Sequence, residues 1–439
     1  MSFFGPITPP LLSEASGPFL RRAFGLAKTV GGFATVQVIV QLISFLAGIL
    51  IIRALSQTEY AYYTIANTMQ ATINLLADLG ISVGLLSIGG RVWHDRRRFG
   101  ELIKTGMQLR RTLGTVVVLI IAPVLCFLLI KNGASLGYSV ALLLVVLFGA
   151  AIQLSVGVLG VVPRLLSNVR LIQKIDLAGA LIRLLLLLGV LLLFFLNASI
   201  AVAVGTVTIL TQYLMLRRYT ATVVDLSAPP NTEDRMTILG IIRNQAANTV
   251  FYCFQGQIAI LLISLFGTRP GAIAEVGALG RLAMIFTVLN NLLANIFVPA
   301  FARCQNPRKL KWLYAAILGG VIGFSLLILL AAALFPREFL LILGPKYSHL
   351  HQELVLMVGG AVLSILTGTL WGLNASKAWI AGSWLYIPLT LAAQAALIPL
   401  VDLSSVRGVL LFNLISAVPN LLLNAALSYR GFRMLQPVA

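Results

Sequence analysis

The fold is decided by residues 34 to 90, which read ATVQVIVQLISFLAGILIIRALSQTEYAYYTIANTMQATINLLADLGISVGLLSIGG. Two apolar runs flank a short polar piece, Arg53 to Glu59, and the first run, Phe33 to Ile52, has 20 residues and no charge. A helix of that length is about 30 Å long, which matches the hydrocarbon core of a bilayer. Isolated strands are excluded because they leave backbone groups unpaired in lipid. The second run opens with tyrosines suited to a headgroup interface, Tyr60, Tyr62 and Tyr63, so we expect a membrane-spanning helical hairpin that turns there.

The composition places most of the chain in lipid. Of the 439 residues, 59% are hydrophobic and only 10% are charged, whereas about a quarter of the residues in a soluble domain are charged. The formal net charge is +19, but membrane topology explains most of this excess, so nucleic acid is not an expected partner. Cys126, Cys253 and Cys304 lack the spacing of zinc ligands or of a disulfide framework. We therefore expect neither a metal nor another cofactor.

Apolar runs between polar breaks predict an all-α integral membrane protein with about twelve transmembrane helices. The six helices of the first half are expected near residues 30–52, 60–87, 108–130, 138–162, 174–196 and 198–216. The six of the second half are expected near residues 238–266, 274–301, 312–335, 352–376, 378–400 and 405–428.

A polar connection at mid-chain divides these helices into two bundles. We expect a cytoplasmic tail, a six-helix bundle, a cytoplasmic linker, a second six-helix bundle and a second cytoplasmic tail, at residues 1–28, 29–218, 219–236, 237–429 and 430–439. An offset of 216 residues superposes Gln41 on Gln257 and Glu59 on Glu275. Six helices restore the same orientation, so the bundles are predicted to be parallel repeats related by a pseudo-two-fold axis along the membrane normal.

The basic residues alternate between rich and poor loops. One side collects clusters such as Arg96 to Arg98 and Arg308 to Lys311. The opposite side has few basic residues, namely Arg53, Lys131, Arg269, Arg337, Lys346 and Arg407. The positive-inside rule therefore places both termini in the cytoplasm.

Three motifs carry a resemblance to a known family. LSQTEYAYYTIA with LLADLGIS (residues 55–66 and 75–82), FPREFLLILGPKY (335–347), and VGALGRLAMIF with VPAFAR (276–286 and 298–303) resemble the polysaccharide-transport or O-antigen flippase family. This family belongs to the multidrug/oligosaccharidyl-lipid/polysaccharide exporter superfamily. One departure is Ala61, where the family usually has glycine after the Glu-Tyr pair, whereas Gly277 keeps it in the second half.

The resemblance implies a transporter and not an enzyme. It implies two bundles that rock around a central cavity in the bacterial inner membrane and flip a lipid-linked oligosaccharide of the undecaprenyl-pyrophosphate type. Membrane lipids are then partners, and a polysaccharide polymerase is a further candidate. The alternative in the same superfamily is an ion-coupled drug or metabolite antiporter.

Three arginines lie inside predicted helices, where a charge is costly unless it faces water or a partner. We expect Arg183 and Arg281 to face the cavity and hold the anionic headgroup, and Arg243 to stay near the cytoplasmic boundary. An ion pair of Arg183 or Arg281 with Asp78 is the structural alternative, and Asp78 is also a candidate ion-coupling site, since burial of a carboxylate favours its protonated form.

Polar helix faces complete the predicted site. The seventh predicted helix carries Asn244, Asn248, Tyr252 and Gln255 on one face, and the first carries Gln37, Gln41 and Ser44 on one face. These side chains could line a sugar path, and hydrogen bonds between helices explain them equally well.

Overall fold

The computed structural model describes residues 18–166, 168–193, 195–304, 306–377 and 379–434, with side chains from Thr35 onward except at residues 169, 244, 245, 270, 295, 296, 299 and 303. The described chain is helical throughout, joined by short loops. Most of the two predicted tails lies outside the described residues, while residues 18–28 extend the first helix.

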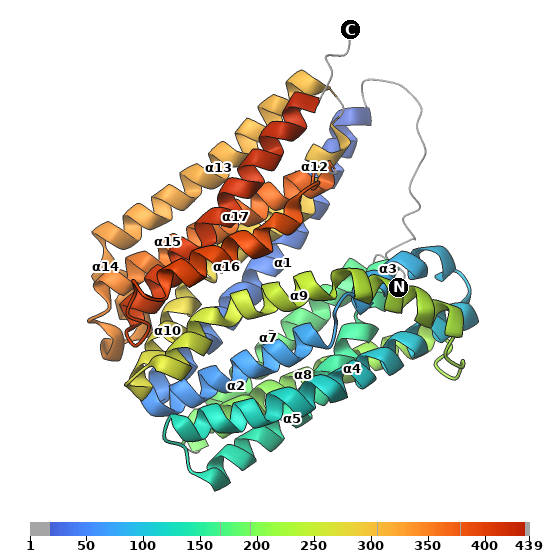
Figure 1. Cartoon of the computed structure of the whole chain (residues 1–439). Coiled ribbons are helices and arrows are strands. Elements are labelled where there is room, and N and C mark those ends of the chain that lie inside the picture. The colour runs from blue at the N-terminus through green and yellow to red at the C-terminus, as the bar shows by residue number, and fades with distance from the viewer. Residues whose placement is uncertain (1–17, 167, 194, 305, 378, 435–439) are drawn as a thin grey trace.

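The first half of the chain forms one helical bundle (Figure 1). Its helices are α1 (Pro18–Ala54), α2 (Gln57–Leu76), α3 (Ile81–Val92), α4 (Arg96–Lys131), α5 (Leu136–Leu159), α6 (Val161–Leu165), α7 (Val169–Leu193) and α8 (Ala198–Val223). Polar side chains begin several of them by accepting hydrogen bonds from the first backbone N–H groups. Ser56 caps α2, Asp95 caps α4 and Asn197 caps α8.

The second half forms the other bundle. It contains α9 (Thr232–Phe266), α10 (Pro270–Leu282), α11 (Ile285–Leu292), a π-helical turn (Leu293–Phe297), α12 (Val298–Arg303), α13 (Pro307–Leu334), α14 (Pro336–Leu343), α15 (His351–Ser376), α16 (Tyr386–Leu397) and α17 (Val406–Met434). Short 3₁₀ turns lie at Pro345–Tyr347 and Ser383–Leu385.

The number of crossings agrees with the sequence to within one helix. Nine helices of the described chain are long and apolar enough to span a bilayer, and two bent pairs raise the number to 11. The predicted helix at 378–400 corresponds to a shorter apolar helix, Ser383–Leu397. The chain is thus a multi-pass membrane protein with two bundles.

The two bent pairs occupy equivalent places in the two halves. The α2 to α3 pair bends by 44° and the α10 to α11 pair by 43°. The sequence predicted each as one straight run, but Leu79 (φ 37°) and Gly80 (φ 98°) break the first pair with left-handed backbone. The matched bends agree with the repeat expected from the 216-residue offset.

The equivalent helices α2 and α10 pack against each other at the centre of the molecule. A Cβ atom on Gly277 would lie 2.6 Å from Oγ1 of Thr64, so only glycine allows this approach. Glu59 of α2 accepts a hydrogen bond from the Tyr138 hydroxyl at 2.6 Å, and Glu275 of α10 contacts His349 at 3.2 Å. Glu59 therefore links α2 to the start of α5, and Glu275 links α10 to the turn before α15. In each half, the partner segment is the fourth that spans the membrane.

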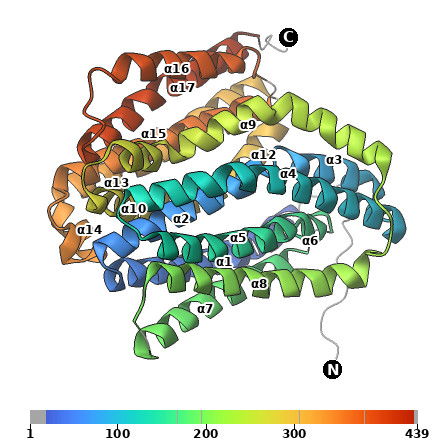
Figure 2. The ribbon, with the colours of Figure 1, turned by 60° about the horizontal axis from the view of Figure 1, so that its bottom comes forward.

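The bundles meet at one end and diverge toward the other (Figures 1 and 2). At the end where they meet, which we call the closed end, Arg53 donates to the carbonyl of Leu341 at 2.6 Å and Lys346 to that of Leu55 at 2.7 Å. The Lys131 ammonium donates to the carbonyl of Leu265. Three cations of the predicted lysine- and arginine-poor side thus join the bundles.

The mid-chain connection is shorter and more closely packed than predicted. Helices extend into both ends of the predicted linker, which leaves residues 224–231 as the loop. This loop packs against the start of α4, where Asp225 N–H donates to the Arg96 carbonyl at 3.1 Å and Asn231 N–H donates to Thr105 at 2.8 Å. The bidentate pair of Arg98 with Asp234 fixes the start of α9 to the first bundle.

Candidate functional site

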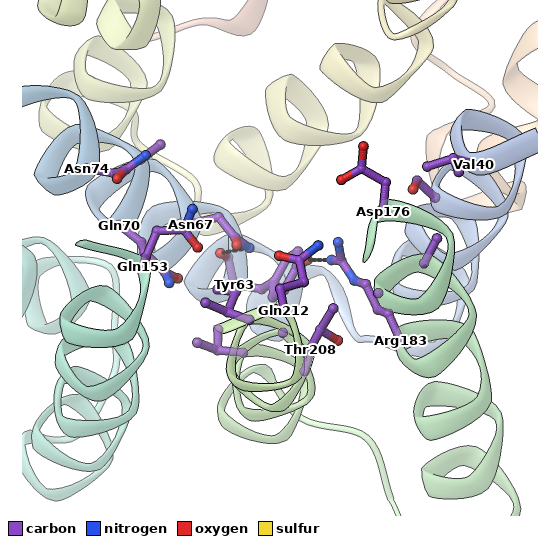
Figure 3. A pocket seen from close by; sticks show the side chains of 18 of the residues that line it. Val40, Tyr63, Asn67, Gln70, Asn74, Gln153, Asp176, Arg183, Thr208 and Gln212 are labelled. Atoms are coloured by element: carbon purple, nitrogen blue, oxygen red, sulfur yellow. Dashed lines mark hydrogen bonds between the residues drawn. The ribbon is translucent and has the colours of Figure 1, made fainter. Parts of the chain in front are cut away.

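The first bundle contains an open cavity of about 540 Å³, which we call the N-cavity (Figure 3). Helices α1, α2, α5, α7 and α8 line it, and most of its polar groups are amides: Gln37, Asn67, Gln70, Asn74, Gln153 and Gln212. Asp176 and Arg183, both on α7, are its only charged lining residues in the described chain. Amide groups both donate and accept hydrogen bonds, so this cavity suits a polar ligand rich in hydroxyl groups.

Two arginines, one from each bundle, converge on a single tyrosine of α2. Nη2 of Arg183 donates to the Tyr63 hydroxyl at 2.8 Å (Figure 3). The Arg281 guanidinium of α10 lies near the hydroxyls of both Tyr60 and Tyr63. Both rings are 1% exposed. The Tyr60 and Tyr63 hydroxyls therefore lie beside arginines where the bundles meet, whereas the Tyr62 hydroxyl donates to the Asn132 carbonyl at 3.3 Å. The placement of these tyrosines at a headgroup interface stays a prediction.

The charges of Arg183 and Arg281 are not neutralised by acidic partners. No carboxylate among the described side chains lies within 4.0 Å of either guanidinium. Nε of Arg183 is buried and lacks a hydrogen-bond partner in the described chain. Since a guanidinium has five donors, this site can bind an additional acceptor such as a phosphate oxygen.

The alternative ion pair between Asp78 and Arg183 or Arg281 is not formed among the described residues. Asp78 accepts hydrogen bonds from the backbone and hydroxyl of Ser82, at 3.2 and 2.7 Å, and its Oδ1 lies 3.3 Å from Nη1 of Arg110. The sequence placed Arg110 at the cytoplasmic start of the predicted helix 108–130, but α4 begins at Arg96 and carries Arg110 into the bundle, where it is 4% exposed.

Arg110 occupies space that a glycine provides. A Cβ atom on Gly157 would lie 2.1 Å from its Nη1 atom. Nη2 of Arg110 donates to Asn74 at 2.8 Å, and Asn74 lines the N-cavity. The Asp78 and Arg110 pair therefore supports one wall of that cavity, while the ion-coupling role of Asp78 stays a prediction.

The remaining predicted residues lie in different surroundings. Gln41 is not part of the N-cavity lining, and its buried Nε2 has no partner among the described residues. Arg243 and Asn248 of α9 are both exposed. The Asn244 side chain lies outside the described residues. Gln255 faces α16, where it exchanges hydrogen bonds with Gln394 at 3.2 and 2.8 Å.

Sequence reasoning missed Asp176, the role of Tyr63 and most of the amides. A signal was present for some of them, because Asn67, Gln70 and Asn74 recur at the spacing of one helical face. Asp176 and Arg183 are likewise seven residues apart, which is two turns. The contact of Tyr63 with Arg183 joins residues 120 positions apart, and no local pattern announces it.

Comparison with known proteins identifies the fold. No protein-family model and no curated protein match the sequence. Solved structures do match over most of their length. A eukaryotic MATE transporter, AtDTX14, has a TM-score of 0.64 at 14% identity, covering 94% of this chain and 98% of its own. An outward-facing multidrug resistance MATE family transporter has a TM-score of 0.63 at 14% identity, covering 92% and 94%.

A third match comes from Pyrococcus furiosus. It is a transporter of the MOP superfamily, whose binding pocket is described as having reverse polarity, which suggests a different function for that protein. Its TM-score is 0.53 at 15% identity, covering 92% of this chain and 94% of its own. The chain therefore has a MATE-like transporter fold, and identities this low establish the fold alone.

Proposed function

We propose that the protein is an alternating-access transporter. The observation that supports this function is the arrangement of two bundles that join at the closed end and diverge beyond it, with a polar cavity and two uncompensated arginines between the ends. A substrate bound at the seam is accessible from the open end only. Transport then requires the closed end to separate and the opposite end to close.

The charge of the seam favours a substrate with an anionic headgroup. Arg183 and Arg281 lie without carboxylate partners in a place of low dielectric, where a cation is attracted to phosphate more strongly than in water. The amide-lined N-cavity beside them suits sugar hydroxyls. We infer that the substrate is a lipid-linked oligosaccharide, and that the protein flips it across a bacterial cytoplasmic membrane.

An ion-coupled drug or metabolite antiporter is the second candidate, and the comparisons favour it. One structural neighbour is described as a multidrug resistance transporter, and Asp176 in the N-cavity is a carboxylate that could bind a proton or a cation. The Pyrococcus furiosus protein supports the idea that pocket polarity distinguishes functions on this fold. The two candidates therefore differ in whether the positive charge of Arg183 and Arg281 is needed for transport, and variants of these arginines test that need.

The test uses proteoliposomes that contain a fluorescent polyprenyl-diphosphate oligosaccharide. Flipping is measured as the fraction of probe that an external, membrane-impermeant quencher reaches. We expect Arg183→Gln and Arg281→Gln to slow flipping at least about tenfold, because glutamine keeps hydrogen bonding but loses the charge. Arg183→Lys should restore part of the rate, since lysine keeps the charge without the bidentate fork.

The matched control is Arg217→Gln, which changes an exposed arginine of α8 outside both cavity and seam. It should leave flipping unchanged. Normal flipping by both seam variants would refute the anionic substrate. Proton-driven ethidium efflux by the wild-type protein, without any flipping, would establish the antiporter in its place.

Orientation follows from the loop charges and is part of this proposal. Both termini lie in the cytoplasm, so the closed end faces outward and the described conformation opens inward. Cysteines that replace Lys131 or Lys346 should react with an impermeant maleimide added outside intact cells, whereas one that replaces Arg308 should not. The reverse pattern would overturn the orientation.

A further inference from the structure

A second cavity lies in the other bundle and is not explained by the arginine site. This C-cavity has a volume of about 470 Å³ and is lined by α9, α15, α16 and α17. Its lining among the described residues is aromatic, amide and hydroxyl, and it includes no charged side chain. Unlike the N-cavity, it therefore offers no charged group that would favour an ionic ligand over an uncharged one.

Aromatic rings form one wall of the C-cavity. Tyr252 of α9 and Tyr386 of α16 are stacked, with ring centroids 5.0 Å apart and an interplanar angle of 22°. Phe251 packs edge-on against Tyr386 at 5.2 Å and holds it in place. Trp371 of α15 also lines the cavity and is 38% exposed. The negative face of such rings attracts the weakly positive C–H groups on the face of a sugar ring.

Polar atoms of the C-cavity are buried without partners. Oγ1 of Thr367, Oγ of Ser416 and Oδ1 of Asn424 have no hydrogen bond in the described chain. Their residues are 8%, 3% and 3% exposed. Leaving such groups unsatisfied costs stability, so their presence in a cavity indicates a polar ligand or ordered water. The Asn424 amide group is meanwhile fixed by its bond to Asn420 Oδ1 at 2.8 Å, which aims its oxygen.

We propose that the C-cavity binds the uncharged glycan part of the substrate. Stacked rings beside unsatisfied hydroxyl and amide groups match a sugar, which has both apolar faces and hydroxyl groups. An acyl chain would leave the polar atoms unpaired, and an organic cation would find no carboxylate in the lining. This inference rests on the proposed function, because it gives the second bundle a share of the same substrate.

A smaller cavity adjoins the C-cavity. It has a volume of about 290 Å³, shares Ser364 and Asn413 with the C-cavity, and reaches Ala283 at the α10 to α11 bend. The space beside the C-cavity thus extends to the end of the helix that carries Arg281, although Arg281 itself does not line it.

The experiment measures binding of sugars without their lipid. Protein in lipid nanodiscs, free of sugar-based detergent, is studied by saturation-transfer difference NMR with maltotetraose and with chitotetraose. We expect saturation of at least one of them, and about two- to tenfold weaker binding to Ser416→Ala, which removes one hydrogen-bonding group. The matched control Ser325→Ala also removes a buried, unpartnered hydroxyl, 1% exposed on α13 and outside the cavities, and should bind as the wild type does.

A second matched pair tests the aromatic wall. Trp371→Leu should weaken binding at least about fivefold, whereas Trp384→Leu, a change at a tryptophan outside the C-cavity, should not. Arg281→Gln, which changes a residue that lines neither cavity, should bind the tetrasaccharide as the wild type does, because the seam holds the anion. An arginine variant that transports weakly but binds sugar normally would show that the arginine site and the C-cavity fail independently of each other.

Three results would overturn the inference. The first is no saturation of either tetrasaccharide. The second is equal binding to Ser416→Ala, Trp371→Leu and the wild type. The third is displacement of bound tetrasaccharide by tetraphenylphosphonium, which would assign the aromatic wall to organic cations.

Discussion

The closed end offers the most direct test of alternating access, because side chains that hold it are few and exposed. Arg53 donates to the carbonyls of Leu341 and Ile342 at 2.6 and 3.1 Å. Lys346 donates in return to the carbonyls of Arg53 and Leu55 at 3.2 and 2.7 Å. The double variant Arg53→Met, Lys346→Met removes all four bonds and keeps most of the length of each side chain.

The expected size of the effect follows from these bonds. An exposed hydrogen bond contributes about 0.5 kcal/mol, at the low end of the usual range, because water competes for both partners. Four bonds then contribute about 2 kcal/mol to the closed arrangement. Their loss should raise the population that is open at this end by up to about 30-fold.

The assay measures a distance across the closed end. Spin labels at Leu136 of α5 and Leu334 of α13, which are 65% and 70% exposed, report the separation of the bundles by double electron–electron resonance. The three native cysteines, Cys126, Cys253 and Cys304, are first replaced by alanine. In the double variant, a longer distance should appear or grow in the distribution.

Arg337→Met provides the matched control. Arg337 is an exposed cation on α14, the helix whose carbonyls accept the hydrogen bonds of Arg53. It has no hydrogen bond or ion pair to the other bundle among the described residues. It should leave the distance distribution unchanged. An unchanged distribution in the double variant, or an equal shift in the control, would refute the view that these bonds hold the closed end.

Two further predictions concern the interior. Tyr63→Phe removes the hydroxyl that binds Arg183 and should lower the rate of flipping about tenfold. The control Tyr62→Phe removes a hydroxyl that donates to a loop carbonyl at 3.3 Å and should leave the rate unchanged, so equal rates of the two variants in the proteoliposome assay would contradict this prediction. Asp78→Asn leaves the buried Arg110 without its counter-charge and should destabilise the fold by about 3 kcal/mol. The measurement is the thermal unfolding midpoint, which should fall. An unchanged midpoint would show that the pair does not contribute to stability.

The fold was largely predictable because lipid imposes a simple rule on the sequence. A segment that crosses must be apolar over about 20 residues and must satisfy its own backbone, so apolar runs map onto helices. Bends obey no such rule. The run through LADLG reads as continuous, yet Leu79 and Gly80 adopt positive φ there. Helix ends were also underestimated, because polar extensions such as Arg96 to Arg110 continue a helix beyond the apolar run.

The site was predictable only in part. A sequence shows how far a charged residue lies inside a predicted membrane helix, but it does not show which side chain that residue contacts. The cost of a charge inside the membrane singled out Arg183 and Arg281, and the structure brings both to Tyr63. The same reasoning offered Asp78 only as an alternative partner for these arginines. Its partner in the structure, Arg110, was placed at the cytoplasmic start of the predicted helix 108–130, so its burial could not be foreseen before the start of α4 was known.

Under the proposed function, the position of the two arginines would link substrate binding to movement of the bundles. Arg183 belongs to the first bundle and Arg281 to the second, and both contact Tyr63 where α2 packs on α10. An anion that binds both guanidiniums interacts best with one separation of the bundles, and any rocking that changes this separation changes its binding energy. A ligand shifts a conformational equilibrium only through such a difference in affinity. A charge placed deep in either bundle would have no such effect, whereas a pair that spans the seam allows the substrate to bias the transporter between its states.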